Sequence, residues 1–426
     1  MSILEDARAV VAEGPVCDPC LGRCFADRSF GLTNRERGRA LRTAVALDED
    51  DPFEEPGDCW VCEGYSAEFG TWADRITEEL AGTEFASYQV GTKTPPLVAE
   101  NESLLRESAG LAEDAGESFK SEFNREVGKR VGKKTGADVD FERPDVLAVI
   151  DLAEDTVDVQ VNAAFVYGRY RKLARGIPQT EWPCGECGGY GLRGDEVCPT
   201  CKGTGYQYPL SVEQLTAPVV EDAMDGEDSK FHGAGREDID ALMLGTGRPF
   251  VVEVERPKKR FPDVEELESE INEFAGGKAE VEGLRLASYE MVERVKEHDA
   301  DKTYRAEVEF DAPVTGDELA DALAELEDTT IEQRTPERVS HRRADKVRER
   351  RVLEISGDVE DETHATVEVL GEGGLYIKEL VSGDNGRTNP SLAGILDTGA
   401  VVTALDVVSV EGTDEPFERD EFFLDA

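Results

Sequence analysis

Hydrophobic positions along this chain repeat with the periods of both strands and helices. Alternating apolar residues rich in Val and Ile predict paired strands at 143–152 and 155–170, joined by a polar turn. Similar patterns predict later strands at 304–310, 351–355, 365–370 and 400–410. Helical spacing predicts helices at 35–47, 118–136, 210–224, 264–274 and 316–326, with residues 63–140 otherwise helix and loop. This mixture indicates an α+β fold with a mixed, largely antiparallel sheet.

Cysteine spacing adds a second pattern. Eight of the nine cysteines form C-x-x-C pairs: Cys17/Cys20, Cys59/Cys62, Cys184/Cys187 and Cys198/Cys201. The last two pairs repeat a C-x-x-C-x-G-x-G motif, and their thiolates fit one tetrahedral zinc ion with glycines at the turns. The first two pairs are separated by 38 intervening residues, so a helix between them must bring them together. One or two structural zinc ions are expected, with redox chemistry or unrelated pairs as the alternative for the first set. Cys24 is expected to be a small buried hydrophobic residue.

The charge balance points to an unusual environment. The chain has 94 acidic and 47 basic residues, for a net charge of −47, yet 39% of its residues are hydrophobic. Because those residues are patterned, we favour a folded protein adapted to molar salt over a disordered one, with its acidic surface as a solubility device.

Local basic segments stand out in so acidic a chain. Residues 159–180 contain no acids, and residues 334–351 contain eight Arg and Lys against three acids. A third basic run is RPKKR at 256–260. The segments predict phosphate-binding patches, with solvated basic faces as the simpler alternative. The basic residues singled out for RNA contact are Arg169, Arg171, Lys172, Arg342 and Arg343.

Targeting and cofactor motifs are missing from the sequence. The first residues, MSILEDARAVVAEG, are too acidic for a signal peptide, and no run approaches the roughly 18 apolar residues of a membrane span. The protein is therefore expected in the cytoplasm, where cysteine pairs are metal ligands more often than disulfides. No dinucleotide fingerprint or phosphate-binding lysine loop is present, so no nucleotide cofactor is expected. A monomer is the default expectation.

The segment GRYRKLARGIPQ at 168–179, with the strands before it, resembles part of a THUMP-type RNA-binding domain. The resemblance implies a domain that holds the acceptor end of tRNA. Arg and Lys would contact phosphates, while Tyr167 and Tyr170 either stack on unpaired bases or pack beneath the sheet.

Three later segments carry candidate chemistry. They are GREDIDALMLGTGRPF from Gly235, KTYRAEVEF from Lys302 and GLYIKELVSGDNGRT from Gly374. In this order they supply an Asp, a Tyr and a Lys. Asp238 lies in a glycine-flanked loop, and Asp240 is its rival two residues on. A carboxylate in such a loop can act as a nucleophile, and a nearby cation can keep it ionised.

With QRTPERVSHRRAD from Gln333, these segments resemble the archaeal–eukaryotic THUMP-bearing tRNA pseudouridine synthases. The resemblance implies isomerisation of uridine 54 and/or 55 in the tRNA T-loop without a cofactor. Asp238 would be the nucleophile, Tyr304 would stack on the flipped base, and Lys378 would pair with Asp238. Tyr376 and Arg387 would help to bind the RNA. The sequence departs from the family at Leu242, where an Arg is usual.

The resemblance also implies an order of domains. These are an N-terminal zinc-binding segment at 1–66, a THUMP-containing RNA-binding domain at 67–182, a zinc insert at 183–206 and a catalytic domain at 207–426. The alternative is a non-catalytic, zinc-dependent tRNA-binding or chaperone-like protein, because C-x-x-C-x-G-x-G also occurs in J-domain co-chaperones. Other THUMP enzymes are disfavoured, since the chain lacks their methyltransferase and nucleotide-binding motifs.

Overall fold

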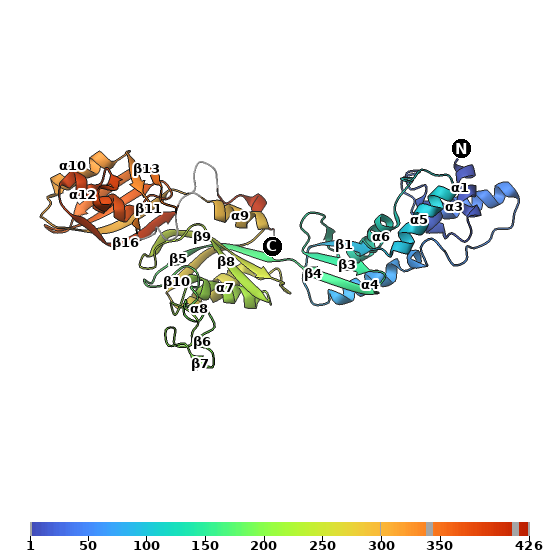
Figure 1. The fold of residues 1–426 in the computed structure, drawn as a ribbon, viewed down its shortest axis with the longest axis horizontal. Helices are drawn as coiled ribbons and strands as arrows, with labels where there is room; N and C mark the ends of the chain where they lie inside the picture. Colours follow the sequence, from blue (N-terminus) through green and yellow to red (C-terminus); the bar gives the residue numbers. More distant parts are fainter. Residues whose placement is uncertain (1, 299, 338–343, 411–416, 425–426) are drawn as a thin grey trace. The chain divides into compact units, whose positions relative to one another are not determined.

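The computed structural model describes residues 2–298, 300–337, 344–410 and 417–424. The chain divides into two compact units, Met1–Asn162 and Ala163–Ala426 (Figure 1). Each unit has its own hydrophobic core. Among the described residues, no helix is both long and apolar enough to cross a membrane.

The first unit packs helices against a small sheet. Its helices are α1 (Ile3–Ala12), α2 (Asp18–Arg23), α3 (Asn34–Glu49), α4 (Phe69–Glu79), α5 (Pro96–Ser108) and α6 (Phe119–Thr135), with a 3₁₀ turn at Tyr65–Ala67. Its strands are β1 (Ser87–Lys93), β2 (Asp138–Val139), β3 (Val146–Asp151) and β4 (Thr156–Val161). They lie in the order β2-β1-β3-β4, parallel except for the β3–β4 pair. One core cluster runs from α1 to β3, so the expected boundary at residue 66 does not divide the core.

Local chemistry explains where the main helices of this unit begin and end. The Thr33 hydroxyl accepts a hydrogen bond from the Glu36 amide, and the Glu36 carboxylate accepts one from the Thr33 amide. Together they form a capping box at the start of α3. Ser118 caps α6 in the same position, and Gly136 ends the helix in the left-handed conformation at φ 79°. Lys133 and Lys134 occupy its last turn, where the helix dipole favours cations.

The second unit is built on a large sheet. Its strands are β5 (Ala164–Lys172), β8 (Asp228–Gly233), β9 (Met243–Glu255), β10 (Ala279–Ala287), β11 (Lys302–Phe310), β12 (Thr330–Arg334), β13 (Val347–Val359), β14 (His364–Gly371), β15 (Thr388–Asn389) and β16 (Ala400–Val410). A separate hairpin pairs β6 (Leu192–Arg193) with β7 (Glu196–Val197). Its helices are α7 (Val212–Ala223), α8 (Val264–Ala275), α9 (Tyr289–Glu297), α10 (Gly316–Leu326), α11 (Ile377–Ser382) and α12 (Leu392–Leu396), with 3₁₀ turns at Gly383–Gly386 and Asp420–Phe422.

The ten strands of the large sheet follow the order β10-β5-β9-β16-β11-β14-β13-β12-β15, with β8 beside β9. All described pairings are antiparallel except β9 with β16, which meet in parallel at Met243 and Val407. Helices α7 and α8 pack on the half that contains β8–β10, and α10 packs on β13 (Figure 1). Each half has its own core cluster, and Tyr304 on β11 packs against both. The expected α+β architecture with a largely antiparallel sheet is confirmed.

The strand expected at 155–170 differs in the structure. The single strand expected at 155–170 is two strands, because the chain leaves the first sheet at Asn162, whose side-chain amide donates to the Pro144 carbonyl at 2.6 Å. β5 then pairs with β9 and β10, so residues 163–182 belong to the second unit and not to an RNA-binding domain ending at residue 182. Strand β1 was not expected within 63–140, although Tyr88, Val90 and Thr92 alternate inward along it.

Candidate functional site

Asp238 lies in the loop between β8 and β9, where Lys378 contacts it. The Lys378 Nζ is 3.2 Å from Asp238 Oδ2 and 3.4 Å from Asp240 Oδ2. The Asp238 side chain is 42% exposed and the Asp240 side chain 73%, so the first is the more enclosed of the two carboxylates. The ammonium beside Asp238 orients its carboxylate, a group that can act as a nucleophile.

Lys378 reaches this loop from a helix. It is the second residue of α11. The Gln333 side chain is fully buried and forms two hydrogen bonds to the Tyr376 backbone, donating to its carbonyl at 2.9 Å and accepting from its amide at 2.8 Å. The Gln333 side-chain amide thus pairs with both backbone groups of Tyr376, as a neighbouring strand would. These two hydrogen bonds fix the start of α11 and therefore the direction of Lys378.

Tyr304 lies in the middle of the large sheet, where its partly buried side chain packs against both core clusters. Burial raises the pKa of its hydroxyl, the Arg248 charge opposes this effect, and the Asp238 charge adds to it. The phenol therefore stays neutral at physiological pH. A neutral aromatic ring close to Asp238 is suited to stack on a base.

Beneath the loop lies a buried polar cluster that sequence analysis did not anticipate. The Glu237 carboxylate accepts from Arg248 Nε at 2.9 Å and from the Tyr170 hydroxyl at 2.9 Å, and all three side chains are almost fully buried. Gln179 donates to the same hydroxyl at 2.8 Å. The desolvation of Glu237 is thus offset by a full set of charged and neutral donors. Glu237 therefore anchors the loop that carries Asp238 to the strands beneath it.

Several residues expected to contact RNA have internal partners. Lys172 is fully buried and cannot reach a phosphate in this conformation, which corrects that expectation. Arg169 donates to the carbonyls of Thr246, Gly247 and Val410. Arg171 pairs with Glu280 and Glu282, at 3.1 and 3.0 Å. The tyrosines of the same strand, Tyr167 and Tyr170, are buried and pack within the unit instead of stacking on bases.

The remaining candidates lie around β12 and α11. Tyr376 is partly buried and is the N-cap residue of α11. Arg387 donates to the Thr335 carbonyl at 2.5 Å and pairs with Glu337 at 3.0 Å. Arg342 and Arg343 lie outside the described residues.

Leu242, the position where the sequence departs from the family, follows the same loop. Its amide donates to Asp406 Oδ1 at 3.0 Å. Asp406 also forms a two-point ion pair with Arg175, at 2.7 and 2.9 Å. The backbone at Leu242 is therefore held by a charged pair that connects β16 to the segment after β5.

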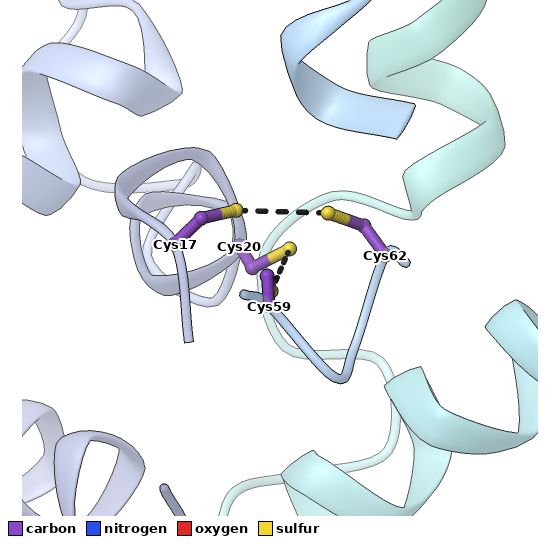
Figure 2. A group of neighbouring side chains, drawn as sticks. All are labelled: Cys17, Cys20, Cys59 and Cys62. Atoms are coloured by element: carbon purple, nitrogen blue, oxygen red, sulfur yellow. Dashed lines mark hydrogen bonds between the residues drawn. The ribbon is translucent and has the colours of Figure 1, made fainter. Parts of the chain in front are cut away.

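Both sets of cysteines gather into compact clusters. The thiols of Cys17, Cys20, Cys59 and Cys62 lie within 4.8 Å of one another, and the same holds for Cys184, Cys187, Cys198 and Cys201. In the first cluster the sulfur atoms of Cys17 and Cys62 are 3.7 Å apart and those of Cys20 and Cys59 are 3.6 Å apart (Figure 2). Four thiolates at 2.3 Å from a central zinc ion would be separated by about 3.8 Å. Each cluster can therefore hold one metal ion in a closed tetrahedral set.

The two clusters differ in their surroundings. The first lies in the main core of its unit, with ligands from α2 and from the turn at 59–62. The second forms a core cluster of its own around the β6–β7 hairpin. Cys24 is buried and its thiol donates to the Cys20 carbonyl at 3.5 Å, which agrees with the role expected for it.

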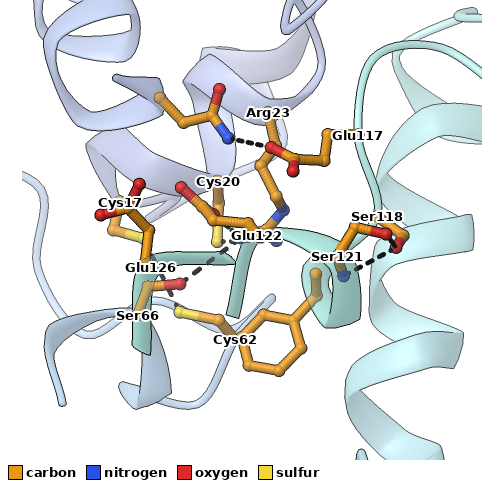
Figure 3. Close-up of polar contacts among 12 residues, drawn as sticks. Cys17, Cys20, Arg23, Cys62, Ser66, Glu117, Ser118, Ser121, Glu122 and Glu126 are labelled. Atoms are coloured by element: carbon orange, nitrogen blue, oxygen red, sulfur yellow. Dashed lines mark hydrogen bonds and ion pairs between the residues drawn. The ribbon is translucent and has the colours of Figure 1, made fainter. Parts of the chain in front are cut away.

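A buried arginine connects the first cluster to α6. The Arg23 guanidinium donates to Cys20 Sγ at 3.3 Å and to Glu122 Oε2 at 2.9 Å (Figure 3). It also pairs with Glu102 at 3.3 Å. A single cation thus faces a thiol on one side and two carboxylates on the other. Such a hydrogen bond to a metal-ligating sulfur orients the ligand and offsets its charge.

Comparisons with known proteins cover nearly the whole chain. Residues 165–411 match the family model "Pus10, C-terminal", and residues 72–151 match "Pus10 THUMP domain, archaeal". The chain is 64% identical over 425 residues to tRNA pseudouridine synthase Pus10 of Halorubrum lacusprofundi, covering 99% of this chain and 100% of that protein. It is 44% identical over 437 residues to tRNA pseudouridine synthase Pus10 of Methanothrix thermoacetophila, covering 96% and 95%.

Among solved structures, the chain is similar to one titled "Crystal Structure of a Cbf5-Nop10-Gar1 Complex". The TM-score is 0.31 and the identity 16%, over 57% of this chain and 48% of that one. The matches to the family models and the two relatives carry the comparison.

Proposed function

Because this chain belongs to the Pus10 family of tRNA pseudouridine synthases, we propose that it isomerises uridine 54, uridine 55 or both in the T-loop of tRNA, with Asp238 as the nucleophile. One observation carries the proposal. Residues from three separate motifs meet at one place, where Lys378 pairs with Asp238 at 3.2 Å and the Asp238 charge acts on the Tyr304 hydroxyl. Such a substrate is expected in the cytoplasm.

The reaction changes an N-glycosidic bond into a C-glycosidic one. The bond between the uracil N1 and the ribose C1′ breaks, the base rotates, and a bond forms between C5 and C1′. The proton on C5 is lost and N1 gains one, so the product is an isomer of uridine. The Asp238 carboxylate attacks the base or the sugar carbon and so divides this change into two easier steps. Tyr304 supports the flipped base by stacking, and the Lys378 ammonium orients the carboxylate through the ion pair at 3.2 Å.

Zinc is the metal that we propose for both cysteine clusters, because closed sets of four thiolates are typical of structural zinc. All four positions around each ion would be occupied by cysteine, which leaves none for substrate. The metal would therefore stabilise the fold, while the reaction at Asp238 would use protein side chains alone.

Mapping of pseudouridine on an unmodified tRNA transcript tests the proposed substrate. Because the net charge is −47, the protein is assayed in molar potassium chloride, where the repulsion between its carboxylates is screened. We expect new pseudouridine in the T-loop, and transcripts with cytidine at position 54 or position 55 distinguish the two sites. A folded, tRNA-binding protein that forms no pseudouridine would favour a non-catalytic RNA-binding role instead.

Replacement of the cation beside Asp238 tests the ion pair. We expect Lys378→Met to lower the single-turnover rate constant about a hundredfold, because the carboxylate loses the group that orients it. Lys378→Arg should retain more activity, since a guanidinium also pairs with a carboxylate. Lys230→Met is the matched control, since Lys230 is 51% exposed and pairs only on the surface with Glu255. A wild-type rate in Lys378→Met would contradict the proposed role.

A further inference from the structure

The buried ammonium of Lys172 is a charged group for which the reaction described above has no use. Lys172 ends β5 and its side chain is 0% exposed, although the basic segment around it predicted a contact with phosphate. Its Nζ instead donates to three backbone carbonyls, those of Ile177, Asp238 and Ile239, at 2.9, 3.0 and 3.3 Å. A lysine has three ammonium protons, so these three contacts use its full donor capacity.

Two of those carbonyls belong to the loop that carries Asp238, and neighbouring residues hold the same loop. The Gly176 amide donates to the Ile239 carbonyl at 3.0 Å, and Arg175 donates to the Asp240 carbonyl at 2.7 Å. The carbonyls of three successive loop residues are therefore all bound by the segment from Lys172 to Gly176. This segment fixes the height and direction of the loop above the sheet.

The buried charge of Lys172 is balanced locally. Glu237 Oε1 lies 3.6 Å from its Nζ, and the Glu237 side chain is 0% exposed. Because Glu237 also pairs with Arg248 at 2.9 Å, two cations share one carboxylate. Burial lowers the pKa of Lys172 and the Glu237 charge opposes that effect. A buried cation that is held in this way is expensive to desolvate, which favours a role that a neutral side chain could not fill.

We propose that Lys172 is a positioning residue for the reaction, which holds the backbone of the Asp238 loop so that the carboxylate meets its substrate in the productive geometry. This inference rests on the proposed function of Asp238. Lys172 touches the carbonyl of Asp238 and not its carboxylate, so it acts through the position of the loop. A displacement of about 1 Å at a nucleophile lowers a rate by as much as about a hundredfold.

Lys172→Met tests the proposal in the full-length protein. Methionine keeps the length of the side chain and removes the three donors. Glu237 keeps its pair with Arg248, so one buried carboxylate then faces one buried cation. We expect the single-turnover rate constant per folded molecule to fall about ten- to a hundredfold, with the Kd for tRNA changed by less than about twofold. Lys230→Met on β8, which pairs with β9, is the control, and thermal unfolding gives the folded fraction.

Each other outcome is decisive. A weaker Kd with an unchanged rate at saturating tRNA would show a phosphate contact and overturn the proposal, as would a wild-type rate and Kd. If Lys172→Met does not fold, Lys172→Gln keeps an amide donor and is measured in the same way; failure of both to fold would make Lys172 purely structural. Asp238→Asn in the same assay distinguishes a failure of the proposed nucleophile from a failure of the positioning role of Lys172. An active Asp238→Asn would overturn the proposed nucleophile, whereas an inactive one beside a wild-type rate in Lys172→Met would overturn only the positioning role.

Discussion

Asp238→Ala is expected to abolish pseudouridine formation while leaving the protein folded and able to bind tRNA. Loss of a covalent nucleophile commonly lowers a rate on the order of 10⁴-fold or more. The fold should tolerate the change, because the Asp238 side chain is 42% exposed and its pair with Lys378 is partly solvated. Partly exposed pairs of this kind contribute about 0–1 kcal/mol to stability. Single-turnover mapping of pseudouridine, with tRNA binding and thermal unfolding measured in the same salt, checks all three expectations.

Asp240→Ala distinguishes the two carboxylates that share Lys378. Asp240 is 73% exposed and slightly farther from the ammonium, at 3.4 Å against 3.2 Å. We expect this variant to keep its rate within about tenfold of the wild type, since it loses one contact of the cation and no reacting group. The reverse result, with Asp240→Ala inactive and Asp238→Ala active, would assign the nucleophile to Asp240.

The motifs that we propose to carry the reaction could be found in the sequence because each has a local pattern. A glycine-flanked loop before an apolar segment predicted where Asp238 lies, and strand alternation predicted the element that carries Tyr304. The surroundings of Asp238 were not readable, because a charged side chain has the same letter whether it is buried or solvated. Glu237 and Arg248 are paired in the interior through a contact between a loop and a strand. Burial of this kind follows from tertiary packing, which has no periodic signal in a sequence.

The basic segment at 159–180 is a second case in which the sequence did not distinguish buried charged residues from exposed ones. Its lack of acids predicted a surface for phosphate, yet the segment contains the strand β5, which is flanked by β9 and β10 and ends at the buried Lys172. A position surrounded by backbone carbonyls disfavours an acidic side chain, just as a position that faces RNA phosphates does. The absence of acids therefore does not distinguish the two environments. The cysteine spacing was more informative, since ligand geometry depends on short sequence separation in the second cluster. For the first cluster the spacing left the metal open, and only the packing of α2 against the turn at 59–62 brings its four thiols together.

Removal of one cysteine from the first cluster is expected to destabilise the whole first unit, whereas the same change in the second cluster should act locally. Cys20 is 1% exposed and belongs to the core that runs through the first unit, so Cys20→Ser leaves a damaged metal site inside that core. Structural zinc contributes on the order of 10 kcal/mol to the folding of small domains. We expect the unfolding midpoint of this unit to fall by about 10 °C or more. Hydrogen exchange measured by mass spectrometry resolves the two units within the intact chain.

Cys198→Ser and Cys24→Ser make the comparison specific. Cys198 belongs to a cluster formed only by the segment around the β6–β7 hairpin, so its loss should speed exchange there and leave β5 and β9 protected. Cys24 is buried beside the first cluster without belonging to it, and a serine hydroxyl can keep the hydrogen bond to the Cys20 carbonyl. Elemental analysis should therefore find two metal ions per chain in the wild type and in Cys24→Ser, and one in each ligand variant. Two retained ions in Cys20→Ser, with unchanged exchange across α1–α6, would show that the four thiols of the first cluster do not form a structural metal site.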